Sequence, residues 1–190
     1  MDSHLTEITD EEIAGRVQRG DTDAFGVLVE RYEPKMLRYG RRFLAQYEDV
    51  EDAVQDVFIK AYTNIQSFNI SLSFSPWIYR IAHNTFINVI KKKGREPLSF
   101  FEPDTILQFS SPETEVEHQV YAAEERKMIE EQLSKLDPKY RAPLVLCFFE
   151  EKDYKEISDI LRIPTSTVGV RIKRAKEKLK ILYQEYDHGR

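Results

Sequence analysis

The chain has 190 residues, of which 41% are apolar and 32% charged, and its formal net charge is −5 at pH 7. This balance predicts a folded, soluble and mainly helical protein. No apolar run approaches the ~20 residues of a membrane span, and the acidic start MDSHLTEITDEE lacks the apolar segment of a signal peptide, so we expect no membrane insertion and a cytoplasmic location.

The sequence carries no recognisable catalytic or metal-binding pattern. Its four histidines are far apart, and none stands at metal-ligand spacing from the single cysteine, Cys147. Cys147 lies in the apolar run PLVLCFF, where a small buried thiol is a simpler interpretation than a reactive one. Because no phosphate-binding loop and no serine nucleophile elbow is present, we expect no catalytic residue, metal, cofactor or small-molecule substrate.

Four helices are predicted in the first half of the chain. The first covers residues 10–18, and the second covers about 22–46, with Asp21 as N-cap and Pro34 as the site of a lost hydrogen bond or a kink. The third carries an apolar stripe from Val50 to Ile65. The fourth runs from about Ser75 to Lys93, with Ser75 as its cap and a proline in its first turn, after the short loop 67–74.

Charge changes sign in blocks along the rest of the chain. Residues 74–95 contain cations and no carboxylate, residues 96–117 contain carboxylates and no cation, and residues 165–180 contain six cations against Glu177. Residues 94–114 also hold prolines and serines without helical period, which predicts a linker. Its large apolar side chains, among them Phe100 and Phe101, indicate that part of it docks on a surface. The order basic, acidic, basic predicts two cation-rich modules joined by an acidic strap.

The last third predicts a helix-turn-helix. Helices are expected from about 117 to 135, through PLVLCFFE after a break at Asp137, over residues 154–161, and from about Thr165 onward. An apolar ridge with spacings of four, three, four and three lies on the last helix, and cations occupy another face; the ridge is Val168, Ile172, Ala175, Leu179 and Leu182, and the cations are Arg171, Arg174 and Lys178. Such a helix lies in the DNA major groove while the preceding one braces it. The alternative is a solvated helix with a lysine-rich face.

Two other segments each allow two interpretations. In residues 74–93, FSPWIYRIAHNTFINVIKKK, aromatic side chains alternate with cations and amides, a pattern that suits unstacked bases and phosphates. Alternatively, aromatics such as Trp77 belong to the core. Opposite the apolar stripe of the third helix, residues 48–56 form an acidic face, which is either solvated or a docking surface for a basic partner.

Taken together, five segments of the chain resemble the extracytoplasmic-function (ECF) sigma factors, small two-domain bacterial transcription initiation factors. In order, they are DAFGVLVERYEPKMLRYGRRFL, EDVEDAVQDVFIKAY, FSPWIYRIAHNTFINVIKKK, LDPKYRAPLVLCFFEEKDYKEISDIL and IPTSTVGVRIKRAKEKL. The resemblance covers nearly the whole chain. It departs from the family at Arg162, where many members have glycine, and at Gly169 and Val170, where the family often has a basic residue and a hydroxyl.

The resemblance implies an all-α fold of two small helical domains with a flexible acidic linker: residues 1–95, linker 96–117, and residues 118–190. It also implies three binding surfaces and a set of partners. Core RNA polymerase would bind Asp49, Asp52, Gln55 and Asp56. The −10 promoter element would be read and melted by Phe68, Asn69, Trp77, Arg80, His83 and Asn84. The −35 element would be read by Thr165, Ser166, Thr167, Arg171, Lys173, Arg174 and Lys178. An anti-sigma factor is the expected regulator. The alternatives left open are a conventional helix-turn-helix regulator with a helical N-terminal sensing domain, and a helical adaptor.

Overall fold

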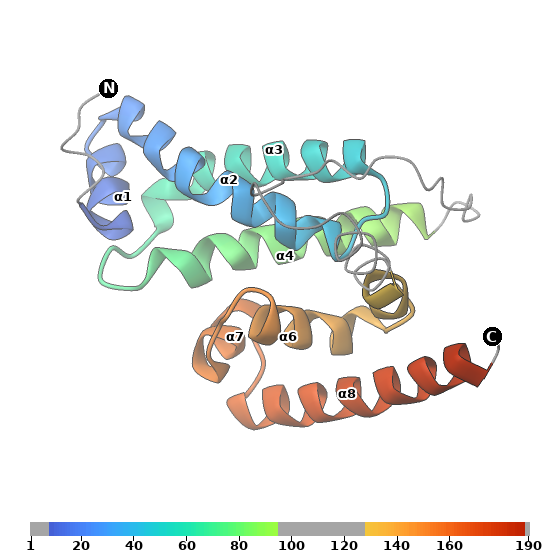
Figure 1. The fold of residues 1–190 in the computed structure, drawn as a ribbon. Helices are drawn as coiled ribbons and strands as arrows, with labels where there is room; N and C mark the ends of the chain where they lie inside the picture. Colours follow the sequence, from blue (N-terminus) through green and yellow to red (C-terminus); the bar gives the residue numbers. More distant parts are fainter. Residues whose placement is uncertain (1–7, 95–127, 189–190) are drawn as a thin grey trace, which may run out of the picture.

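The computed structural model describes residues 8–94 and 128–188 (Figure 1). Within these ranges every regular element is a helix, which confirms the all-α fold class. Residues 128–134 are helical, whereas the predicted linker and the start of the helix expected from 117 lie outside the described residues. The elements are α1 (Asp10–Gln18), η2 (Thr22–Ala24), α2 (Phe25–Arg41), α3 (Tyr47–Asn64), η3 (Ile65–Ser67), α4 (Phe74–Lys93), α6 (Pro138–Phe148), α7 (Tyr154–Leu161) and α8 (Thr165–His188).

Helices α1 to α4 share one apolar core that is rich in aromatic side chains. Tyr32, Tyr39 and Phe86 are each at most 2% exposed and pack between α2 and α4. Gly40 of α2 allows the close approach of its neighbours, because a Cβ at this position would lie 3.0 Å from a Val50 methyl and 3.1 Å from the Phe86 ring. A larger residue here would therefore require the buried side chains of Val50 and Phe86 to shift.

The start and end of α2 differ from the sequence-based expectation. Asp21 caps the chain as predicted, accepting from the Ala24 N–H at 3.3 Å, but it opens the 3-10 turn η2, and α2 follows. The helix ends at Arg41, not near residue 46. Phe43 and Leu44 both donate their N–H groups to the Gly40 carbonyl, at 2.8 and 2.9 Å, so the regular ladder stops there while both side chains stay buried.

The start of α4 also differs. Its N-cap is Ser73, two residues before the predicted Ser75, and the Ser73 side chain makes no capping bond. The first free N–H, that of Phe74, donates at 2.8 Å to the Glu11 carboxylate of α1 instead. Pro76 still lies in the first turn, where helix N–H groups have no partner within the helix.

The C-terminal helices begin with local capping signals. The predicted break at Asp137 is the start of α6: Asp137 caps the helix, and Pro138 is its first residue. Asp153 and Glu156 form a reciprocal capping box at the start of α7, with bonds of 2.8 and 3.0 Å. Helix α7 then packs against both α8 and α4, so that α4 lies between the N-terminal helices and the C-terminal ones (Figure 1).

A buried carboxylate joins the two halves of the molecule. The Glu150 side chain is 0% exposed. Arg38 of α2 donates to it through Nε and Nη2, at 3.1 and 2.9 Å, and the Tyr79 hydroxyl of α4 donates at 2.6 Å. Burial and the neighbouring carboxylate raise the pKa of Tyr79 far above its usual value. Next to this cluster, Lys152 donates to the Ser75 hydroxyl at 2.8 Å.

Candidate nucleic-acid interface

The acidic face of α3 borders a groove. The apolar stripe is buried as predicted, with Val54 and Val57 at most 3% exposed. On the other side, a groove of about 520 Å³ lies between α3 and the end of α4. It is lined by Asp49, Asp52, Ala53, Gln55, Asp56, Ile59, Val89, Lys92 and Lys93. The four residues that the resemblance assigns to polymerase binding thus lie together. Asp49 is paired with Lys93, whereas Asp52 and Gln55 are exposed.

The loop after α3 is held over a cluster of three aromatic rings. Phe68 is only 5% exposed, and its ring packs on Phe74 and Trp77 with centroid distances of 5.4 and 5.1 Å. Phe68, which the resemblance assigns to the −10 contact, is buried in this structure and supports the loop from beneath. The exposed part of the loop begins at Asn69, whose side-chain oxygen accepts from the Ser71 N–H at 3.0 Å.

The DNA-contacting residues expected on α4 differ in exposure. Asn84 is exposed, while Trp77, Arg80 and His83 are half-buried. His83 Nδ1 lies 3.2 Å from the Tyr39 hydroxyl, and burial lowers the pKa of His83 to about 4, so its ring is neutral at pH 7. Burial also lowers the pKa of Arg80, with a further contribution from repulsion by Arg162.

Helices α7 and α8 form the predicted helix-turn-helix. Val168, Ile172 and Ala175 are at most 3% exposed, which confirms the apolar ridge. Thr165 and Ser166 are exposed in the first turn of α8, and Thr167 is half-buried. Among the cations, Arg171 is half-buried and the other three, Lys173, Arg174 and Lys178, are exposed. They form a basic surface along α8.

The turn between these helices contains a left-handed residue. Arg162 ends α7 with φ 55° and ψ 45°. Glycine adopts this left-handed conformation without cost, whereas it is unfavourable for residues with a Cβ. Gly169, by contrast, is half-buried and faces Tyr154 of α7. A Cβ there would lie 3.4 Å from the ring of Tyr154, so this glycine lies where α8 packs on α7.

The C-terminal half covers part of the α4 surface. Helix α7 packs on α4, and Arg80 is close enough to Asp159 and Arg162 for their charges to affect its ionisation. In this arrangement, Arg80 is less accessible than the exposed residues of the loop or of the basic surface of α8. Sequence reasoning missed the contact that holds this arrangement, because the side chains of Arg38, Tyr79 and Glu150 are distant in sequence and form no local motif.

The described residues give no sign of a metal site or of a membrane span. No group of three or more histidine, cysteine or acidic side chains is placed to hold a metal ion in these ranges. Cys147 is half-buried, and burial raises the pKa of its thiol. Among the described helices, none has the length and apolarity to cross a membrane.

Comparison with known proteins agrees with this geometry. The sequence model described as Sigma-70 region 2 matches residues 28–96, and that described as Sigma-70, region 4 matches residues 126–179. The ECF RNA polymerase sigma factor SigW of Bacillus subtilis is 36% identical over 176 residues, covering 87% of this chain and 91% of SigW. The chain therefore belongs to the ECF sigma factors of the sigma-70 family, and it is a transcription initiation factor.

Solved structures show the same fold. The structure of CnrH in complex with the cytosolic domain of CnrY is 26% identical, with a TM-score of 0.71, and covers 93% of this chain and 97% of CnrH. The sigma factor RpoE of Bartonella quintana, solved with the anti-sigma factor NepR, is 20% identical with a TM-score of 0.67, and covers 84% of this chain and 96% of RpoE.

Proposed function

We propose that the chain binds core RNA polymerase through the α3 groove, reads and melts the −10 element with the loop 68–73 and α4, and reads the −35 element with α8. The observation that carries this proposal is the combination, in one chain, of a groove with an acidic α3 wall and a helix-turn-helix. A conventional regulator needs the helix-turn-helix alone, and nothing in the described residues favours that alternative.

The α3 groove suits a basic partner that also offers an apolar side chain. On its α3 wall, Asp52, Gln55 and Asp56 line the groove together with Ile59, which is 60% exposed, and Lys92 and Lys93 line the opposite wall. Charged residues on such a rim steer association, and an exposed apolar centre supplies area to bury. Reversing both Asp52 and Asp56 to lysine should weaken polymerase binding without unfolding the chain, because neither side chain is in the core. Reversing Glu30 and Glu33, which are exposed on α2, is the matched control.

The −10 assignment rests on the loop and on the adjacent face of α4. Asn69 and Asn84 present exposed amides, which can hydrogen-bond to the edges of unpaired bases. Arg80, which lies near Asp159 and Arg162 of the C-terminal half, would add a cation after the C-terminal helices move away, and His83 would add an aromatic ring from the same helix. Trp77 and Phe68 hold the loop from beneath.

The −35 assignment rests on the first turns of α8. The hydroxyls of Thr165, Ser166 and Thr167 lie at a helix N-terminus, which favours phosphate. Arg171 and Arg174 project beside the buried ridge, where arginine can read guanine. Lys173 and Lys178 would add contacts to the phosphate backbone.

The proposed domains are residues 1–95 and 118–190, with 96–117 as the linker. A protein inhibitor is the proposed regulator, since RpoE of Bartonella quintana was solved with an anti-sigma factor.

The test is transcription by the purified chain with core polymerase on a library of genomic fragments. Transcripts that start at defined sites, and only when the chain is present, are expected. Binding of the chain to duplex DNA without polymerase-dependent initiation would refute the proposal and favour a conventional regulator.

A further inference from the structure

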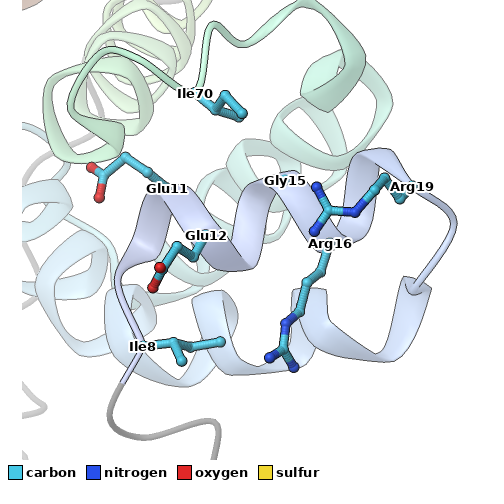
Figure 2. A pocket seen from close by; sticks show the side chains of 7 residues that line it. All are labelled: Ile8, Glu11, Glu12, Gly15, Arg16, Arg19 and Ile70. Atoms are coloured by element: carbon cyan, nitrogen blue, oxygen red, sulfur yellow. The ribbon is translucent and has the colours of Figure 1, made fainter.

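Helix α1 has no assigned role. The match to Sigma-70 region 2 starts at residue 28, after α1 has ended. Yet α1 packs on the turn η3 and on the start of α4, the two elements that bracket the loop 68–73. Figure 2 shows the side of α1 that faces Ile70 of this loop, with Gly15 and Arg19 next to it.

Two side chains of α1 bond to the two ends of the loop. Gln18 donates through Nε2 to the carbonyls of Ile65 and Phe68, both at 2.7 Å. Glu11 accepts from the N–H of Phe74 at 2.8 Å and so replaces the missing side-chain cap of α4. In the opposite direction, the Gln66 side chain of η3 donates to the Gln18 carbonyl of α1 at 3.1 Å.

The middle of the loop has few other constraints. Its internal bonds join Ser71 and Leu72 to Asn69, at 3.0 and 2.9 Å. Ile70 and Leu72 are 46% and 62% exposed, so packing holds them only in part. Against α1, the loop leaves a groove of about 370 Å³. The conformation of the loop therefore depends on how its two ends are anchored.

We propose that Gln18 and Glu11 are positioning residues for promoter reading: they hold the loop 68–73 in the one conformation in which it discriminates an unpaired base. This inference rests on the proposed −10 role of the loop. Neither residue touches the base. A loop that is no longer bonded to α1 still contacts the unpaired promoter strand, but it samples several conformations and discriminates less between bases.

The experiment uses polymerase holoenzyme assembled with the full chain. The probe is a duplex whose non-template strand carries a short, randomised unpaired segment, and sequencing of the bound fraction gives the base preference. Gln18→Met keeps the length of the side chain and removes both donors. It should reduce the preference for the best base over the others by about 10-fold, the equivalent of one or two neutral hydrogen bonds.

The controls separate positioning from loss of structure. Gln46→Met applies the same substitution to an exposed glutamine before α3 and should leave the preference unchanged. Binding to core polymerase and to a duplex −35 probe should be the same in all variants. If Gln18→Met does not fold, the Glu11 pair decides: Glu11→Gln retains the acceptor and should keep the preference, whereas Glu11→Met should lose it.

The possible failures are distinguishable. If wild type selects bases and neither Gln18→Met nor Glu11→Met changes the selection, the positioning role is wrong and the −10 role of the loop stands. If wild-type holoenzyme selects no base, the proposed function of the loop is wrong, and the positioning role falls with it.

Discussion

Replacing Glu150 by alanine should uncouple the two halves of the molecule. The carboxylate is fully buried and receives three hydrogen bonds, two from Arg38 and one from Tyr79. Hydrogen bonds to charged groups contribute about 1.5–3 kcal/mol each when buried. The Arg38 side chain is 51% exposed, so its pair contributes only about 1 kcal/mol. Tyr79 would lose its partner in a buried position, at a cost of about 1–3 kcal/mol.

The expected total is about 3 kcal/mol, or roughly a 100-fold shift toward separated halves. The chain contains one tryptophan, Trp77, which lies in α4, so its fluorescence follows the N-terminal half during urea unfolding. Circular dichroism follows the helices of both halves. In wild type the two signals should change together, and in Glu150→Ala they should separate or move to lower urea.

Glu131→Ala is the matched control, because Glu131 forms an exposed pair with Lys135 at 3.1 Å with both side chains nearly half exposed. It should change the midpoint little. Coincident transitions at the wild-type midpoint in Glu150→Ala would refute the role given to this carboxylate.

Three further predictions concern single side chains. Arg162→Gly should raise the free energy of unfolding by about 1 kcal/mol, because it relieves the left-handed backbone; urea unfolding that shows no gain would contradict this. His83→Asn should make the free energy of unfolding less sensitive to acid. The folded pKa of His83 is about 4 and its unfolded pKa is near 6.5, so the stability that neutral His83 contributes above pH 6.5 is lost as the pH falls toward 4, by up to about 3 kcal/mol. Denaturation at pH 7 and pH 4 in both proteins checks the sign. Arg174→Ala should relax base preference within the −35 element, by about 1–3 kcal/mol of discrimination; equal loss of affinity for matched and scrambled duplexes would make Arg174 a phosphate contact.

Features with a local cause were predictable from the sequence. The apolar stripe of α3 and the ridge of α8 follow from helical spacing. The break predicted at Asp137-Pro138 lies at the start of α6, because an aspartate followed by proline favours the first turn of a helix. The odd residue at the turn, Arg162, was visible as a departure from the family pattern. The structure adds that this residue has a left-handed backbone, which explains why many members have glycine there.

Features with a distant cause were not predictable. The start of α4 shifts to Ser73, where Glu11 bonds to the Phe74 N–H from a separate helix. The sequence placed Phe68 in a loop and did not show that the rings of Phe74 and Trp77 provide a core for it. Composition gives no sign of either contact, since each depends on how the helices are arranged in space.

The packing of α7 on α4 has a consequence for the free protein in a cell full of competing nucleic acid. Unpaired strands occur in RNA and at replication forks, and a complete single-strand surface would bind them by stacking and charge without regard to sequence. With α7 packed on α4, Arg80 is half-buried and lies near Asp159 and Arg162, while Asp52, Gln55 and Asp56 of the α3 groove are exposed. Under the proposed assignments, polymerase can be bound first and the full single-strand surface assembled afterwards. The unpaired bases that this surface can then reach are those of the promoter. The order of the two events therefore adds selectivity that base contacts alone do not provide.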